Sequence, residues 1–469
     1  FWYLFLFFGH NLCGDRMNNE SYWQKTTTLP HYPKIKQDCT YDIVIVGGGM
    51  SGITLAHRLN DSNFNVALLE SDTLASKTTG HTTGKVTCLH DVICVDICKA
   101  YGNDKAKKYF DSNNEALNEI KEIIEMNKID CDFQENIAYI GASDKVNYEK
   151  ILKQIELFKS WKLDVIVNNN ENISMGLDKQ AIFHPLKYLK GLLEKCNNID
   201  IYEHSLVTKK TIINDEIYLD VNGCKVKTSI VIWMTRYPLN LQKGYFLRLL
   251  QEKEHIIYHE KATSNNSYLD LTTNYSKRPL NNNAMLEINR GVFNNNLYWY
   301  GQDSIPLRKI PYIGKINQHE YIAYGYNKWG MTLSHVASKL IYDMLMNNDN
   351  RYISLYNPNY ANYLYSKNDF IKLIKNNFHG MIKNRILVSK EVDLKENQGK
   401  VINHKGHLIA VYRDKQNRYF YFSPYCPHLK CVIEFNENDN TWNCPCHGSI
   451  FDGYGNLVSI PATRNLKKY

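Results

Sequence analysis

The chain has 469 residues, with 43% hydrophobic and 22% charged side chains and a formal net charge of +8. This length suits two or three domains with a large buried core, which excludes a small scaffold that needs disulfides to fold. The lysines are scattered, and no apolar run approaches the roughly 20 residues that span a bilayer. We therefore expect no nucleic-acid partner, no transmembrane segment and a cytoplasmic location.

The chain opens with an aromatic stretch, FWYLFLFF, and its first methionine is Met17. Such a short apolar stretch cannot cross a membrane. No basic segment precedes it and no small-residue cleavage site follows it, so it does not resemble a signal peptide. We expect residues 1–16 to be a non-native or disordered extension of the fold.

A dinucleotide-binding motif follows. The apolar run Ile43–Val46 predicts a buried strand, and the stretch after it has helical periodicity; between them Gly47, Gly49 and Gly52 form G-x-G-x-x-G. These glycines permit a sharp turn, close approach of a pyrophosphate, and close packing of the helix on the strand. Glu70 ends the next apolar run, where a carboxylate can accept both ribose hydroxyls. The motif alone does not distinguish FAD from NAD.

Later segments predict a doubly wound first domain and a smaller second one. We expect helices over 105–130 and 145–163, a strand-rich region over 200–234, and a strand, glycine turn and helix over 319–346. From residue 386 onward, short strands separated by turns predict a small all-β domain.

Four stretches of the first domain point to FAD. YDIVIVGGGMSGITLAHRL, TTGHTTGKVT, HPLKYLKGLL and YIAYGYNKWGMTLS together resemble FAD-dependent oxidoreductases of the D-amino acid oxidase type. The resemblance covers about residues 35–370 and implies a Rossmann-like α/β FAD-binding domain with an α+β substrate domain. Besides the glycines and Glu70, it implies FAD contacts from Thr78, Thr79, Thr82, Thr83, Val207, Gly325, Gly330, Met331 and Thr332. The chain departs from the family at WMTRYP, where bulky Trp233 and Arg236 replace a small turn.

Four of the twelve cysteines fall within residues 426–446, and the other eight are dispersed without the spacing of metal ligands. Cys426-x-His428 and Cys444-x-x-His447 supply two thiolates and two imidazoles. That ligand set suits either zinc or a [2Fe–2S] cluster in which two histidines replace two cysteines on one iron.

The surrounding sequence favours the cluster. CPHLKC and CPCHGSIFDGYG resemble the Rieske iron–sulfur domain, in particular the cytochrome bc-type subclass with a disulfide between its two ligand loops. The resemblance implies that Cys426 and Cys444 hold the inner iron, that His428 and His447 hold the outer iron, and that Cys431 and Cys446 form the disulfide.

Three residues near the ligands bear on the redox potential. Ser449 matches the hydroxyl that hydrogen-bonds a bridging sulfide, but Phe451 stands where high-potential members have a tyrosine donor. We therefore expect a potential in the lower part of the roughly −150 to +300 mV Rieske range. Lys430 replaces the glycine of quinol-oxidising members, which argues against their docking surface.

The sequence thus predicts an FAD-dependent oxidoreductase domain over residues 17–375 and a Rieske [2Fe–2S] domain over 380–469. We expect two-electron chemistry at the flavin, on a small-molecule substrate for which an amine is the candidate, coupled to one-electron transfer through the cluster to an unknown acceptor or donor. One alternative is an electron-transfer module that acts between protein partners and has no small-molecule substrate. Another is a sensor or relic that binds flavin without turnover. No catalytic residue can be named from the sequence.

Overall fold

The computed structural model describes residues 20–359 and 393–469, except 170–171, 238–241, 281–283, 289–296 and 438, together with Ile371 and Lys375. The chain divides into two compact units, one within residues 20–376 and the other within 377–469. The expected extension at 1–16 lies outside the described residues, as does nearly all of the expected domain boundary at 375–380. Both therefore stay predictions.

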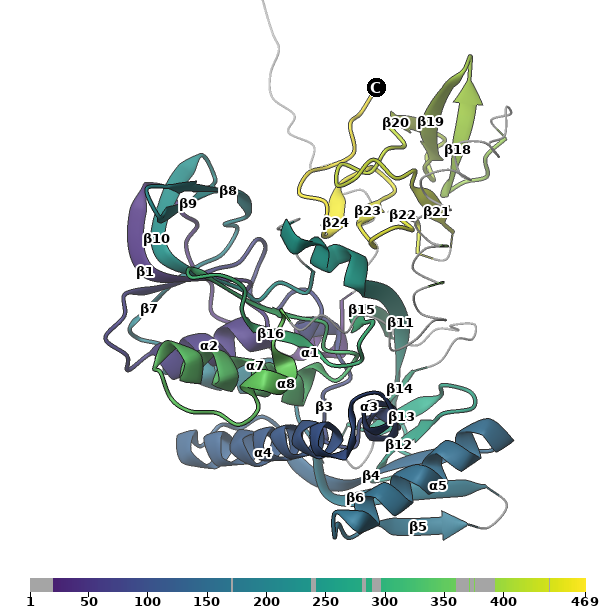
Figure 1. The fold of residues 1–469 in the computed structure, drawn as a ribbon. Coiled ribbons are helices and arrows are strands. Elements are labelled where there is room, and N and C mark those ends of the chain that lie inside the picture. Colours follow the sequence, from purple (N-terminus) through teal and green to yellow (C-terminus); the bar gives the residue numbers. More distant parts are fainter. Residues whose placement is uncertain are drawn as a thin grey trace, which may run out of the picture. The chain divides into compact units, whose positions relative to one another are not determined.

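The first unit contains a mostly parallel sheet with strand order β16-β17-β10-β1-β2-β7 (Figure 1). Strand β1 pairs in parallel with both β10 and β2, and β10 pairs in parallel with β17, so their carboxyl ends share one edge of the sheet. An antiparallel hairpin, β8–β9, extends β10. The bounds are β1 Cys39–Val46, β2 Val66–Leu69, β7 Ile199–Tyr202, β8 Val207–Ile213, β9 Glu216–Val221, β10 Cys224–Trp233, β16 Tyr312–Lys315 and β17 Glu320–Tyr324.

Helices pack in layers beside this sheet. Helix α2 (Met50–Leu59) contacts α7 (Gly330–Leu345) and α6 (Pro185–Leu193), and α7 contacts α4 (Asn103–Asn127). The expected helices at 105–130 and 145–163 are α4 and α5 (Lys145–Ser160). Shorter elements are α1 Tyr22–Thr26, α3 Ile93–Tyr101, α8 Ile353–Tyr356, η1 Thr79–His81 and η2 Gln242–Arg248. None of the helices described is both long and apolar enough to cross a membrane.

A second, mixed sheet belongs to the same unit and has the order β15-β11-β14-β13-β12-β4-β6-β3, with β5 beside β6. Its bounds are β3 Lys85–Val86, β4 Gln134–Ala142, β5 Ile166–Asn169, β6 Ile173–Ile182, β11 Leu249–His259, β12 Ser267–Asp270, β13 Ser276–Pro279, β14 Met285–Ile288 and β15 Tyr298–Pro306. This sheet, with helices α3 to α5, has the expected α+β architecture, and its role as a substrate domain stays a prediction.

The C-terminal unit is all-β among its described residues. One sheet has the order β18-β19-β20 and the other the order β21-β22-β23-β24. The bounds are β18 Gln398–His404, β19 His407–Arg413, β20 Tyr419–Phe422, β21 Glu434–Asn436, β22 Thr441–Asn443, β23 Ile450–Asp452 and β24 Leu457–Ser459. The predicted fold class, an α/β FAD-binding domain with an α+β domain and a small all-β domain, is confirmed.

Candidate functional sites

The glycine turn after β1 is shaped by close main-chain contacts. Gly47 has φ +115°, a conformation that side chains disfavour, and a Cβ there would lie 2.7 Å from the Met234 carbonyl oxygen. A Cβ on Gly52 would lie 1.9 Å from the carbonyl oxygen of Gly47. Gly49 is the N-cap of α2 and offers no side-chain oxygen to the first helical N–H groups. The turn therefore presents bare backbone donors at a helix N-terminus, which fits a pyrophosphate.

Glu70 lies directly after β2 and is fixed by three hydrogen bonds. Its Oε2 accepts from the Gly48 N–H at 2.8 Å. Its Oε1 accepts from the Ser71 hydroxyl at 2.8 Å and from the Asp72 N–H at 2.9 Å. A carboxylate has about four lone-pair positions, so capacity remains for a ribose hydroxyl. The position fits the predicted role.

The predicted threonine loop lies next to the glycine turn. Thr79 Oγ1 accepts from the Met50 N–H at 3.0 Å, in the first turn of α2. Thr78 Oγ1 donates to the Gln302 carbonyl at 3.1 Å, on strand β15 of the second sheet. The Thr82 carbonyl accepts from Trp23 Nε1 at 2.7 Å, and Thr83 is partly exposed. This loop therefore bridges the two sheets.

The second predicted turn connects β17 to α7. Gly325 has φ +78°, and a Cβ there would lie 2.9 Å from a Leu249 methyl group. Gly330 begins α7, and Met331 is buried after it. The Thr332 hydroxyl lies 3.1 Å from His90 Nε2 and 2.9 Å from Asn113 Oδ1, so its side chain is engaged within the protein.

Val207 begins β8 and is buried opposite Val221 of β9. Its contact with FAD stays a prediction, as do the other predicted FAD contacts, although the glycine turn, Glu70 and Thr79 lie together at one edge of the sheet.

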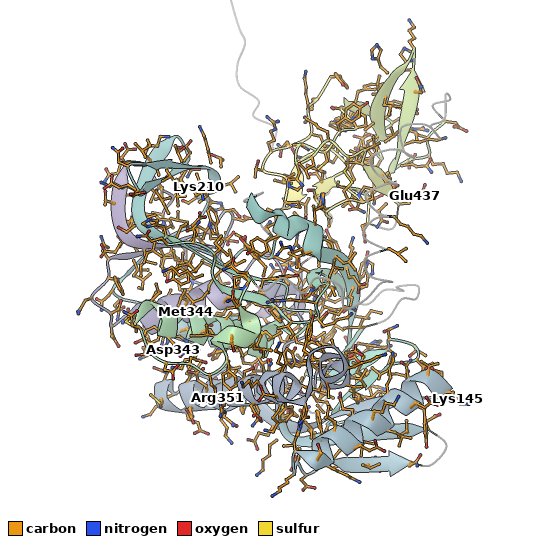
Figure 2. The ribbon with its side chains drawn as sticks, viewed as in Figure 1. Lys145, Lys210, Asp343, Met344, Arg351 and Glu437 are labelled. Carbon is orange, nitrogen blue, oxygen red and sulfur yellow. A yellow bond between two sulfur atoms is a disulfide. The ribbon has the colours of Figure 1, made fainter. Side chains whose placement is uncertain are left out.

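The first residue of the WMTRYP segment is held by a glutamate on a neighbouring strand. Trp233 Nε1 donates to Glu320 Oε2 at 3.0 Å, and both side chains are buried. Glu320 also pairs with Lys210 of β8, which is labelled in Figure 2. Trp233 thus belongs to an ion-pair cluster between neighbouring strands. Burial lowers the pKa of Arg236 to about 10.

Helix α1, which supports the threonine loop, was not predicted from the sequence. Trp23 is fully buried and its indole donates to Thr82. The helix begins with a capping box, in which Ser21 and Gln24 exchange side-chain and backbone hydrogen bonds. The S-x-x-Q pattern at residues 21–24 was the signal that could have revealed it.

Two cations of the second sheet, the partly buried Lys85 and the buried Arg278, were also not predicted from the sequence. Lys85 Nζ donates to Ser276 Oγ at 2.5 Å, and Arg278, which is 1% exposed, donates through Nη1 to the Gly84 carbonyl at 3.1 Å. Burial lowers the pKa of Lys85 to about 7 and that of Arg278 to about 9. Among the described residues, neither forms an ion pair with a carboxylate. Only folding brings these dispersed cations together.

The four predicted cluster ligands converge in the C-terminal unit. The Cys426 and Cys444 thiols lie within hydrogen-bonding distance of each other. The rings of His428 and His447 have centroids 5.1 Å apart, at 85° to each other. Burial lowers the pKa of His428 to about 4 and that of His447 to about 3, which favours the neutral imidazole that binds metal. Two thiols beside two imidazoles fit an asymmetric [2Fe–2S] cluster. The ligand roles of these residues stay predictions.

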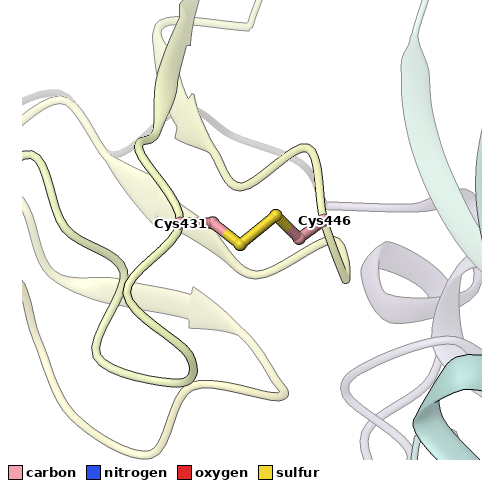
Figure 3. The surroundings of a disulfide bond; sticks show 2 residues. All are labelled: Cys431 and Cys446. Atoms are coloured by element: carbon pink, nitrogen blue, oxygen red, sulfur yellow. A yellow bond between two sulfur atoms is a disulfide. The ribbon is translucent and has the colours of Figure 1, made fainter. Parts of the chain in front are cut away.

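The predicted disulfide between Cys431 and Cys446 is present (Figure 3). It joins the loop before β21 to the loop between β22 and β23. The sulfur of Cys444 lies within 4.8 Å of both disulfide sulfurs. The bridge therefore holds the two ligand loops together beside the predicted cluster.

Two residues beside the ligand loops, Ser449 and Phe451, are buried, and a third, Lys430, has a left-handed backbone conformation. Ser449 is fully buried, its Oγ accepts from the Ala462 N–H at 3.0 Å, and it also hydrogen-bonds Cys426. Phe451 is fully buried on β23, where it cannot donate a hydrogen bond. Lys430 has φ +62°, in the left-handed region, so a glycine at this position would remove backbone strain.

Family models match both units. Residues 42–232 match FAD dependent oxidoreductase, and residues 384–469 match Rieske [2Fe-2S] domain. The chain therefore combines an FAD-dependent oxidoreductase domain of the D-amino acid oxidase type with a C-terminal Rieske domain. The predicted family, enzyme class and cofactors, FAD and a [2Fe–2S] cluster, are confirmed.

Similar proteins cover either nearly the whole chain or about 70% of it. The protein YhfW of Bacillus subtilis (strain 168), named as a Rieske 2Fe–2S iron–sulfur protein, is 28% identical over 96% of this chain and 97% of its own length. Gamma-glutamylputrescine oxidoreductase of Escherichia coli (strain K12) is 23% identical over 70% of this chain and 89% of its own length. The structure of L-amino acid deaminase from Proteus vulgaris superposes with a TM-score of 0.58 at 14% identity, covering 71% of this chain and 96% of that chain.

Proposed function

We propose that this oxidoreductase removes two electrons from a small amine at the flavin and transfers them one at a time through the Rieske cluster to an acceptor outside the chain. The observation that carries the proposal is the pairing, in one chain, of a domain for a two-electron cofactor with a domain for a one-electron cluster. A flavin accepts a hydride and can release single electrons, whereas the cluster carries one electron. Coupling the two would convert substrate oxidation into single-electron steps.

An amine is the substrate class best supported. By their printed names, the similar proteins include a gamma-glutamylputrescine oxidoreductase and an L-amino acid deaminase. In this chain, the partly buried Lys85 and the buried Arg278 suit an anionic group elsewhere on the same substrate, because an anion would compensate their charges. Lys85 is on β3, at the edge of the second sheet, and Arg278 is on β13 of the same sheet. We expect this sheet to belong to the substrate domain.

Anaerobic mixing tests the proposal directly. The FAD- and cluster-loaded protein is mixed with amines and amino acids, while flavin absorbance and the EPR signal of the cluster are followed. We expect one of these compounds to bleach the flavin and then to produce the signal of the reduced cluster. If none bleaches the flavin but a reduced electron-carrier protein does, the chain is an electron-transfer module between protein partners instead. If the protein does not retain FAD, turnover at a flavin is contradicted.

A further inference from the structure

One face of β15 is directed at the threonine loop. Trp299 Nε1 donates to the His81 carbonyl at 3.1 Å, and a Cβ on Gly301 would lie 3.1 Å from the same oxygen. Alternate residues of a strand share a face, so Asp303 lies on this face too. Asp303 therefore lies on the face of the second sheet that meets the threonine loop, which is expected to contact FAD.

A lysine from the turn between β17 and α7 reaches the neighbouring strand, β11. Lys328 Nζ lies 3.0 Å from Glu252 and 2.5 Å from Glu254. Glu252 is directly opposite Asp303 in the antiparallel pair, so the three carboxylates occupy one face. Lys328 has φ +72°, in the left-handed region, as part of the turn expected to close over the flavin. Two segments predicted to hold FAD therefore meet at these carboxylates.

Arg236, which follows the carboxyl end of β10 and belongs to the segment that departs from the family, also acts on Asp303. Burial is the main influence on Asp303 and raises the pKa of its carboxyl to about 6. Glu254 and Glu252 also raise this pKa, whereas Lys328 and Arg236 lower it. These four charged groups, from β11, the turn before α7 and the loop after β10, are those that act on Asp303. The carboxyl would change its ionisation close to physiological pH.

We propose that Asp303 is a catalytic carboxylate that binds the ammonium group of the amine substrate and accepts one of its protons. Lys328 lies within ion-pair distance of both glutamates but, among the described residues, not of Asp303. Asp303 is therefore the carboxylate of this cluster that no ion pair of the described residues holds, although Lys328 and Arg236 both lower the pKa of its carboxyl. This inference rests on the proposed function, since it names the group that would act on its substrate.

The step balances in protons and electrons. The ammonium R–CH₂–NH₃⁺ gives one N–H proton to the Asp303 carboxylate, which becomes a carboxylic acid. The neutral amine then loses a hydride from its carbon to FAD, leaving the iminium R–CH=NH₂⁺ and reduced flavin. The substrate is oxidised by two electrons and FAD is reduced by two.

The test compares Asp303→Asn with the wild type and with Asp111→Asn, a partly buried carboxylate of α4 that pairs with Lys107. We expect the rate of anaerobic flavin bleaching by the amine to rise with pH through about 6 in the wild type and in the control, because Asp303 must be ionised to accept the proton. In Asp303→Asn we expect a rate about 100-fold lower at pH 7 and no such rise. Asp303→Glu keeps a carboxylate and should restore the rise.

A second readout needs no substrate. The loop that meets this face of β15 is expected to contact FAD, so ionisation of Asp303 should shift the absorbance of oxidised FAD near pH 6 in the wild type and control but not in Asp303→Asn. An unchanged bleaching rate and pH profile in Asp303→Asn would overturn the role of Asp303 and leave the proposed function standing. If no amine bleaches the wild-type flavin, the proposed function itself fails, and the ammonium role fails with it.

Discussion

The nucleotide turn and the cluster loops achieve binding in opposite ways. The turn at Gly47 to Gly52 depends on side chains that are absent, because a Cβ on Gly47 or on Gly52 would collide with neighbouring backbone. The cluster loops are expected to depend on side chains that are present, two thiols and two imidazoles held beside a disulfide. A site of the first kind is damaged by adding one carbon atom, and one of the second kind by removing one ligand atom.

The largest expected effect is the loss of a cluster ligand. Cys444→Ser should abolish iron binding and the EPR signal of the reduced cluster, because a serine hydroxyl is a poor substitute for a thiolate. The two units are separately compact, so FAD content should stay unchanged. Iron analysis and flavin absorbance check both statements. Cys196→Ser, at a buried thiol of the other unit, is the control and should keep full iron content.

Gly52→Ala should have the next largest effect. The added Cβ would lie 1.9 Å from the Gly47 carbonyl oxygen, which forces α2 away from β1. Overpacking of this kind costs about 1–3 kcal/mol, so we expect FAD affinity to fall by about tenfold or more. Ala56→Gly on the same helix should cost about 1 kcal/mol of stability but keep the nucleotide turn. Equal FAD affinity in the two variants would contradict the claim that a Cβ at Gly52 disturbs the nucleotide turn.

Substitutions beside the cluster should move its potential without removing it. Ser449→Ala deletes a buried hydroxyl that hydrogen-bonds Cys426. If this donor favours the reduced cluster by about 1.4 kcal/mol, its loss lowers the one-electron potential by roughly 60 mV. Phe451→Tyr should raise the potential by adding a donor. Potentiometric titration followed by EPR measures both. A wild-type potential near the top of the Rieske range would refute the argument from Phe451.

Lys430→Gly should give the smallest effect. Lys430 has a left-handed backbone conformation that costs a non-glycine residue about 1–2 kcal/mol. Glycine should therefore raise the free energy of unfolding of the C-terminal domain by about 1 kcal/mol. Lys400→Gly, in strand β18, should instead lower it by roughly 0.5–1 kcal/mol. Thermal or denaturant unfolding of both variants decides whether backbone strain is present at Lys430.

The sequence predicted those features whose residues lie close together in the chain. The glycine turn, Glu70 and both ligand loops are local patterns with a known chemical requirement. The sequence did not predict the carboxylates around Lys328 or the cations Lys85 and Arg278. Those groups come from strands and turns more than 20 residues apart. The pairing of β11 with β15 and the ion pairs of Lys328 gather the carboxylates, and the hydrogen bond from Lys85 to Ser276 brings Lys85 to the strand of Arg278.

The most direct test of the central claim is laser-flash reduction of the flavin in the loaded protein under argon, followed at flavin and cluster wavelengths. Electron transfer within one chain predicts that reduced flavin decays as the cluster becomes reduced, with a first-order rate that does not depend on protein concentration. Cys444→Ser should lack this phase. A rate that scales with protein concentration, or a flavin that stays reduced beside an oxidised cluster, would contradict the coupling of the two cofactors.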